Sequence, residues 1–172
     1  MRRLFFLAGL LMTVALLAAW PNTLQAQGAF EQVTGKAFDG ALPDKFYLEG
    51  NAIPTQKRNA AMVKTPAGAR VLFALIDTTG YSSQIQQKYE GMIISEGQIS
   101  VCGRTLGVGS YGFGHTKPPA TSNEDATFFM YNQAGEKVAE CSAKKDAEIK
   151  QPRPLQVVLA AGAPARLYFG RH

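Results

Sequence analysis

Short apolar segments with a two-residue period alternate with glycines through the middle of the chain, between Gly91 and Gly114. Three β-favouring pieces lie in this region, Met92–Ser95, Gln98–Cys102 and Leu106–Phe113. Apolar side chains two residues apart lie on one face of a strand, and glycine supplies the backbone freedom that tight turns need. The pattern therefore predicts an antiparallel meander at the centre of the fold.

Paired apolar runs on either side of turn residues predict three further hairpins. Their strands are Ala61–Thr65 with Arg70–Ile76, Thr127–Tyr131 with Glu136–Cys141, and Leu155–Leu159 with Ala165–Phe169. After its first residue, Arg70–Ile76 is continuously apolar, which predicts a central strand buried on both faces, although a buried helix has the same pattern. We expect one all-β antiparallel domain, a β-sandwich or small β-barrel of about seven to nine short strands.

The remaining segments have weaker patterns. Residues 27–45 have scattered apolar positions interrupted by Gly35 and Gly40, which predicts an irregular lead-in with at most one edge strand before the β-domain at 46–172. Pro54 argues against a central-strand position for the residues around it. Ser82–Tyr89 fits either a short capped helix or a polar connection, and Ala143–Lys150 fits either a helical turn or a charged loop.

The first 26 residues have the layout of a secretory signal peptide. Arg2 and Arg3 precede the almost wholly apolar run Leu4–Trp20, and the small residue Ala26 follows a break at Pro21. An uncleaved membrane anchor is the alternative, but the apolar run is slightly shorter than a membrane-spanning helix needs. We therefore predict cleavage after Ala26 and export to the periplasm or outside the cell, with no membrane attachment afterwards.

The two cysteines indicate how the domain is stabilised. Cys102 and Cys141 remain after cleavage, and an even pair in an exported protein predicts a disulfide. Two separate buried thiols are the alternative. With His115 and His172 as the two histidines, the chain fits no zinc-ligand spacing, so we expect no metal and no cofactor.

Charge gives little indication of a partner. The 18 basic residues of the chain include Arg2 and Arg3, so 16 basic and 13 acidic residues remain after cleavage. These charges are scattered along the chain, whereas nucleic-acid binding needs a clustered basic face. We therefore expect no nucleic-acid partner.

His115 is the clearest candidate for acid–base chemistry. It follows a glycine-rich strand and opens a polar loop, where Asp125 or Glu96 could serve as its carboxylate partner. No nucleophile motif accompanies it, so the simpler interpretation is an ordinary surface histidine.

Aromatic residues are frequent in the C-terminal half and suggest a second kind of site. Tyr111, Phe113, Tyr131 and Tyr168 are candidates for lining a ligand groove, although aromatic residues in strands more often form the core. The leading functional hypothesis is an exported, non-enzymatic β-domain that binds a small ligand or a protein. The first alternative is a hydrolase that uses His115, and the second is a small outer-membrane β-barrel, although the predicted strands are shorter than that class needs.

Overall fold

The computed structural model describes residues 29–116, 118–119, 122 and 124–172, so the predicted signal peptide lies outside the described residues. The strands are β1 (Glu31–Val33), β2 (Lys45–Leu48), β3 (Asn51–Lys64), β4 (Arg70–Ile76), β5 (Gly91–Ser95), β6 (Ile99–Val101), β7 (Arg104–Leu106), β8 (Gly109–His115), β9 (Ala126–Tyr131), β10 (Lys137–Ala143), β11 (Arg153–Val158) and β12 (Arg166–Gly170). The helices are α1 (Lys36–Ala41) and α2 (Ser83–Lys88). The predicted all-β antiparallel fold is confirmed.

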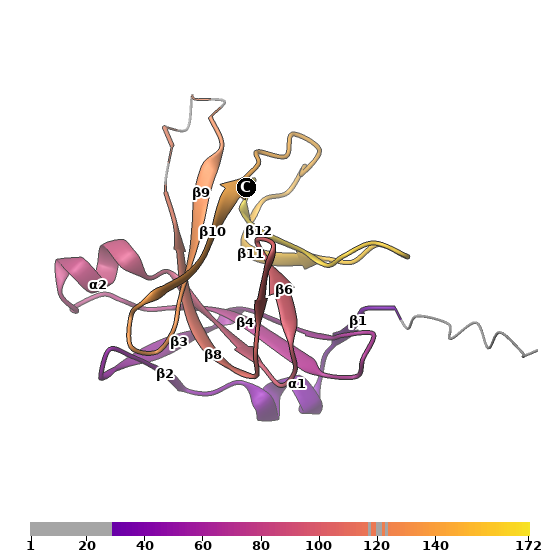
Figure 1. The fold of residues 1–172 in the computed structure, drawn as a ribbon, viewed down its shortest axis with the longest axis horizontal. Helices are drawn as coiled ribbons and strands as arrows, with labels where there is room; N and C mark the ends of the chain where they lie inside the picture. Colours follow the sequence, from indigo (N-terminus) through magenta and orange to yellow (C-terminus); the bar gives the residue numbers. More distant parts are fainter. Residues whose placement is uncertain (1–28, 117, 120–121, 123) are drawn as a thin grey trace, which may run out of the picture.

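One large antiparallel sheet organises the molecule (Figure 1). Its strand order is β1-β3-β4-β5-β8-β9-β10, and β2 pairs with the first part of β3. Within the described residues β1 and β10 are its two edges and do not pair, so the sheet does not close into a barrel. The hairpins β6–β7 and β11–β12 form two small separate sheets.

Both faces of the large sheet are covered, which gives the molecule three layers. Alternate residues of β4 point in opposite directions: Leu72 packs with the core on one face, and Val71 packs with the core on the other. The first face carries α1, β2 and α2, and the second carries the hairpins β6–β7 and β11–β12. In Figure 1, α1 and β2 lie below the sheet and β11–β12 lies above it. Arg70–Ile76 is thus a central strand buried on both faces, as its continuous apolar run predicts.

The three predicted hairpins are present as β3–β4, β9–β10 and β11–β12. The central meander differs from the prediction, because the expected strand Leu106–Phe113 is divided. Its first residue belongs to β7, the exposed Val108 lies in the break, and β8 begins at Gly109. As a result β8 pairs with β5, and β6–β7 forms a separate hairpin between them in the sequence.

Three weaker predictions are resolved by the structure. The lead-in is more ordered than expected, with β1 and the short helix α1 before β2. Pro54 lies inside the fourteen-residue strand β3, and its carbonyl accepts a hydrogen bond from Asp77 N at 2.8 Å. Ser82 caps a helix, α2, by accepting a hydrogen bond from Ile85 N, whereas residues 144–150 are not helical.

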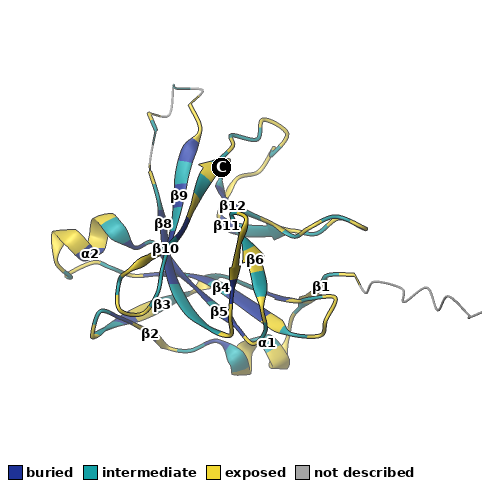
Figure 2. Cartoon of the chain, viewed as in Figure 1, coloured by how far each residue is buried: buried dark blue, intermediate teal, exposed yellow. Residues whose placement is uncertain are grey.

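Two glycines in β8 allow the first face to pack closely. A Cβ at Gly112 would lie 2.7 Å from the Tyr89 ring, and one at Gly114 would lie 2.3 Å from the Lys88 carbonyl oxygen. These positions therefore let the end of α2 lie directly on the backbone of β8. Figure 2 shows that the central strands are mostly buried, whereas α2 and the turns are more exposed. Among the described residues, no helix is long and apolar enough to span a membrane.

Candidate functional site

A cavity of about 900 Å³ lies on the second face of the large sheet. Its floor is formed by Val63, Val71 and Ile93, whose side chains are 1%, 3% and 1% exposed. The walls come from the two hairpins that cover this face, with Ile99 on β6 and Leu167 on β12 among the lining residues. The cavity is therefore lined mainly by apolar side chains.

Strand register explains why these floor residues gather at one place. Val63 on β3 lies opposite Val71 on β4, and Phe73, two residues along β4, lies opposite Ile93 on β5. Residues two apart on a strand, and their direct cross-strand partners, point to the same face. A one-residue slip between these strands would replace the apolar floor with residues from the other core.

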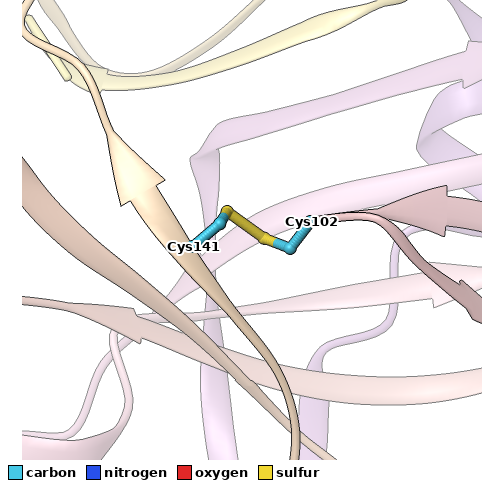
Figure 3. Close-up of a disulfide and its surroundings, with 2 residues drawn as sticks. All are labelled: Cys102 and Cys141. Carbon is cyan, nitrogen blue, oxygen red and sulfur yellow. A yellow bond between two sulfur atoms is a disulfide. The ribbon is translucent and has the colours of Figure 1, made fainter.

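The predicted disulfide between Cys102 and Cys141 is present and forms part of the cavity wall (Figure 3). Its Cα atoms are 5.3 Å apart, within the ordinary range for a disulfide. Cys102 lies in the turn after β6 rather than at a strand end, with a positive φ of 54°, and Cys141 lies on β10. The bond thus attaches the β6–β7 hairpin to the edge of the large sheet, on the side where the cavity lies.

A few polar groups interrupt the apolar lining. The Thr65 hydroxyl oxygen and Nε2 of His172 are buried and have no hydrogen-bond partner within the described part of the chain. Buried polar atoms without a partner are rare in folded proteins because their desolvation is uncompensated. Both residues line the cavity, so a bound molecule could supply the missing partners.

His115 lies beside a second, smaller cleft of about 460 Å³. The Glu90 carboxylate is in contact with Nδ1 of the imidazole. The two side chains are 12% and 19% exposed, so the interpretation of His115 as an ordinary surface histidine is wrong. The imidazole also stacks on the Phe169 ring, with the centroids of the two rings 5.5 Å apart.

The carboxylates named from the sequence are engaged elsewhere. Glu96 accepts a hydrogen bond of 2.7 Å from Nε of Arg70, and Asp125 accepts one of 3.0 Å from the Ser142 hydroxyl. Neither is paired with His115. Glu90 was missed because its proximity depends on which strands pair: it immediately precedes β5, and its N–H donates to the Phe113 carbonyl on β8. The β5–β8 register, which the sequence pattern did not reveal, would have identified it.

None of the four aromatic candidates is among the residues that line the cavity. Phe113 is fully buried in the core of the second face, and Tyr111 packs at the edge of that core. Tyr131 belongs to the first face, where its ring meets the Tyr89 ring edge-on at 5.3 Å. Tyr168 is buried and donates a hydrogen bond of 2.8 Å to Asp146. The aromatic residues that do line the cavity are Phe30, Phe73, Phe128 and Phe169.

A polar cluster on the first face stabilises the fold rather than forming a site. Glu49, with a positive φ of 47°, accepts hydrogen bonds from Nζ of Lys88 and from the Tyr89 hydroxyl at 2.6 Å. The Lys88 and Tyr89 hydrogen bonds hold the pKa of the Glu49 carboxyl below its ordinary value. Burial, followed by the Glu49 hydrogen bond, raises the pKa of the Tyr89 phenol. Every group of this cluster is therefore paired within the protein.

Metal ligands do not gather anywhere in the described residues, since no group of three or more His, Cys, Asp or Glu side chains lies close enough to hold an ion. Comparisons with protein-family models, with curated proteins and with solved structures gave no match.

Proposed function

We propose that this protein is an exported, non-enzymatic β-domain that binds a small, largely apolar molecule in the cavity of the second face. The cavity itself is the observation that supports this proposal. Its volume of about 900 Å³ falls within the range of small-molecule sites, which are typically apolar with a few well-placed polar groups.

The disulfide supports the same function through preorganisation. Cys102 and Cys141 hold the β6–β7 hairpin against the sheet, so one wall of the cavity is in place before a ligand arrives. A wall that is already ordered reduces the entropy lost on binding. Disulfides also persist mainly in oxidising compartments, which agrees with the predicted export.

Binding can be tested with N-phenylnaphthylamine, an apolar dye whose fluorescence rises in an apolar environment. We expect the native protein to bind the dye with saturation, and Ala143→Trp to weaken binding by about tenfold or more by filling the cavity. Ala134→Trp is the matched control, because Ala134 is exposed in the β9–β10 turn and does not line the cavity.

Two results would contradict the proposal. The first is a native protein that shows no saturable dye binding while its circular dichroism remains that of a folded β-protein. The second is equal weakening by Ala143→Trp and Ala134→Trp, which would place the dye on the general surface. Retained binding in Ala134→Trp, together with loss in Ala143→Trp, would support the cavity as the binding site.

A hydrolytic function at His115 is the second candidate, and the contact with Glu90 in a cleft is the observation that favours it. A carboxylate on one ring nitrogen can orient an imidazole, so that the other nitrogen acts as a general base toward water. No serine or cysteine that could act as a nucleophile is among the described residues of the cleft lining, which makes this function the weaker one. We expect a screen of ester, glycoside and peptide substrates to give no activity. A reproducible activity that His115→Ala abolishes, without a change in melting temperature, would favour the hydrolase.

A further inference from the structure

The cavity and the His115 cleft share a wall. Phe169, near the end of β12, and His172, which follows it, line both hollows. The Phe169 ring contacts His115 on the cleft side, and its centroid lies 5.8 Å from that of Phe128, which lines the cavity. The two hollows are therefore neighbours separated at this point by these two side chains, although the cleft is also lined by Ile76 and Tyr89 of the first-face core.

The position of His172 at this boundary is fixed through its backbone. Its N–H donates to the Phe169 carbonyl at 3.1 Å, and its carbonyl accepts from Phe169 N at 2.7 Å. This leaves the imidazole as the part that can interact with a ligand. Its Nε2 atom is buried and without a partner in the described residues. A hydrogen-bonding group of a ligand at the boundary would satisfy this atom.

The charges around the cleft indicate what kind of polar group fits there. The titratable side chains among the described residues that line the cleft are Tyr89, Glu90, His115 and His172, and Glu90 contacts His115. No lysine or arginine is among the described residues that line the cleft. An anionic head group would approach the Glu90 carboxylate without a dedicated cation, and a cationic one would compete with the existing pair. An uncharged head group with hydroxyl or amide groups avoids both costs.

We propose that the cavity and the cleft form one site for a single-chain amphiphile. Its hydrocarbon chain lies in the cavity, and its uncharged, hydrogen-bonding head group meets Nε2 of His172 at the boundary with the His115–Glu90 cleft. This inference rests on the proposed ligand-binding function, because the cavity holds the larger part of the ligand. It adds to that function a ligand class and a residue that selects the head group.

Three amphiphiles with the same dodecyl-length chain test the inference by displacing bound N-phenylnaphthylamine. They are monododecanoylglycerol, dodecanoate and dodecyltrimethylammonium, each used below its critical micelle concentration at neutral pH. We expect the uncharged glycerol ester to compete about tenfold better than either charged compound. Equal competition by all three, or the best competition by a charged one, would overturn the inference.

Substitution of His172 tests the role of the head-group contact. His172→Phe keeps an aromatic ring but removes its polar atoms, so the preference for the glycerol ester over the two charged amphiphiles should disappear. His172→Gln should retain part of the preference, because an amide can still form the hydrogen bond. An unchanged preference in His172→Phe would overturn the inference. Failure of the native protein to bind the dye would instead contradict the proposed function, so the two failures are distinguishable.

Discussion

Glu49 shows how a single residue can join three separated segments. It lies in the turn between β2 and β3, accepts hydrogen bonds from the end of α2, and its N–H donates to the Gln133 carbonyl in the β9–β10 turn at 2.9 Å. A non-glycine residue with positive φ is uncommon, and it persists where the surroundings compensate for the backbone cost. Here the compensation comes from charge-assisted hydrogen bonds.

Gly135→Ala should destabilise the fold more than the same change at a comparable glycine. Gly135 and Gly68 have nearly equal positive φ values, 87° and 88°, so the backbone cost of alanine should be similar at both, about 1 kcal/mol. A Cβ at Gly135 would also lie 2.0 Å from Oε1 of Glu49, which cannot move away without losing its partners. A Cβ at Gly68 meets nothing within 4 Å.

Urea unfolding of both variants measures this difference. We expect Gly135→Ala to lose roughly 1–2 kcal/mol more than Gly68→Ala, because the Glu49 hydrogen bonds are disturbed. Equal losses would mean that Glu49 moves without cost and that its hydrogen bonds contribute little to stability.

Acid should weaken this same cluster. The pKa of Glu49 is lower in the folded protein than its ordinary value of 4.5, because of its hydrogen bonds with Lys88 and then Tyr89. The contribution of the pair to stability is therefore fully present above about pH 4.5 and is lost as pH falls through the folded-state pKa. Glu49→Gln should lower the free energy of unfolding near neutral pH and make its decline below about pH 4.5 less steep. Parallel acid declines in the two proteins, measured by urea midpoints, would contradict this expectation.

At the scale of elements, the β6–β7 hairpin depends on the disulfide for its position. It forms its own two-stranded sheet, and an isolated two-stranded hairpin is at best marginally stable. Its apolar residues, including Ile99 and Leu106, pack on the second face, and Cys102 attaches its turn to β10. Within the cavity wall, the β6–β7 hairpin should therefore change position most when the disulfide is reduced.

Cys102→Ser with Cys141→Ser should lower stability by about 2–4 kcal/mol, since the bond closes a loop with a sequence separation of 39 residues. Denaturant unfolding measures this loss, and N-phenylnaphthylamine binding should weaken at the same time as the cavity wall loosens. The native exported protein should show no free thiols by mass spectrometry under non-reducing conditions. Two alkylatable cysteines in the native protein would contradict the disulfide and the arrangement of the wall.

The elements that sequence predicted well are those whose pattern is local. Arg70–Ile76 is apolar after its first residue because both its faces are buried, and turn residues separate the two strands of each hairpin. Predictions were less accurate where tertiary contacts override a local rule. Pro54 lies within β3 although it lacks a backbone N–H, and its carbonyl accepts a hydrogen bond from Asp77 N. The site was harder to predict than the elements. Glu90 contacts His115 because of the β5–β8 register, and the cavity depends on two hairpins that pack on one face.

At the scale of the whole molecule, the two faces of the large sheet are packed differently. The first face is closely packed, with glycines in β8 that let α2 approach the backbone and a paired polar cluster at its edge. The second face is covered by two small hairpins that pack on the large sheet as separate sheets, and the cavity lies there, whereas the cleft is lined by residues of both cores. Under the proposed function, substitutions that fill the cavity should change binding more than they change folding.

Export is the prediction that concerns the whole chain. Arg2, Arg3 and the apolar run Leu4–Trp20 before Ala26 predict that the mature protein begins near Gln27. Ala29 and Phe30, which line the cavity, would remain in the mature protein after cleavage at this point. Intact-mass measurement or N-terminal sequencing of the extracytoplasmic protein should therefore find a chain that starts near Gln27. A protein that retains Met1–Trp20 would instead mean that this segment is an uncleaved membrane anchor.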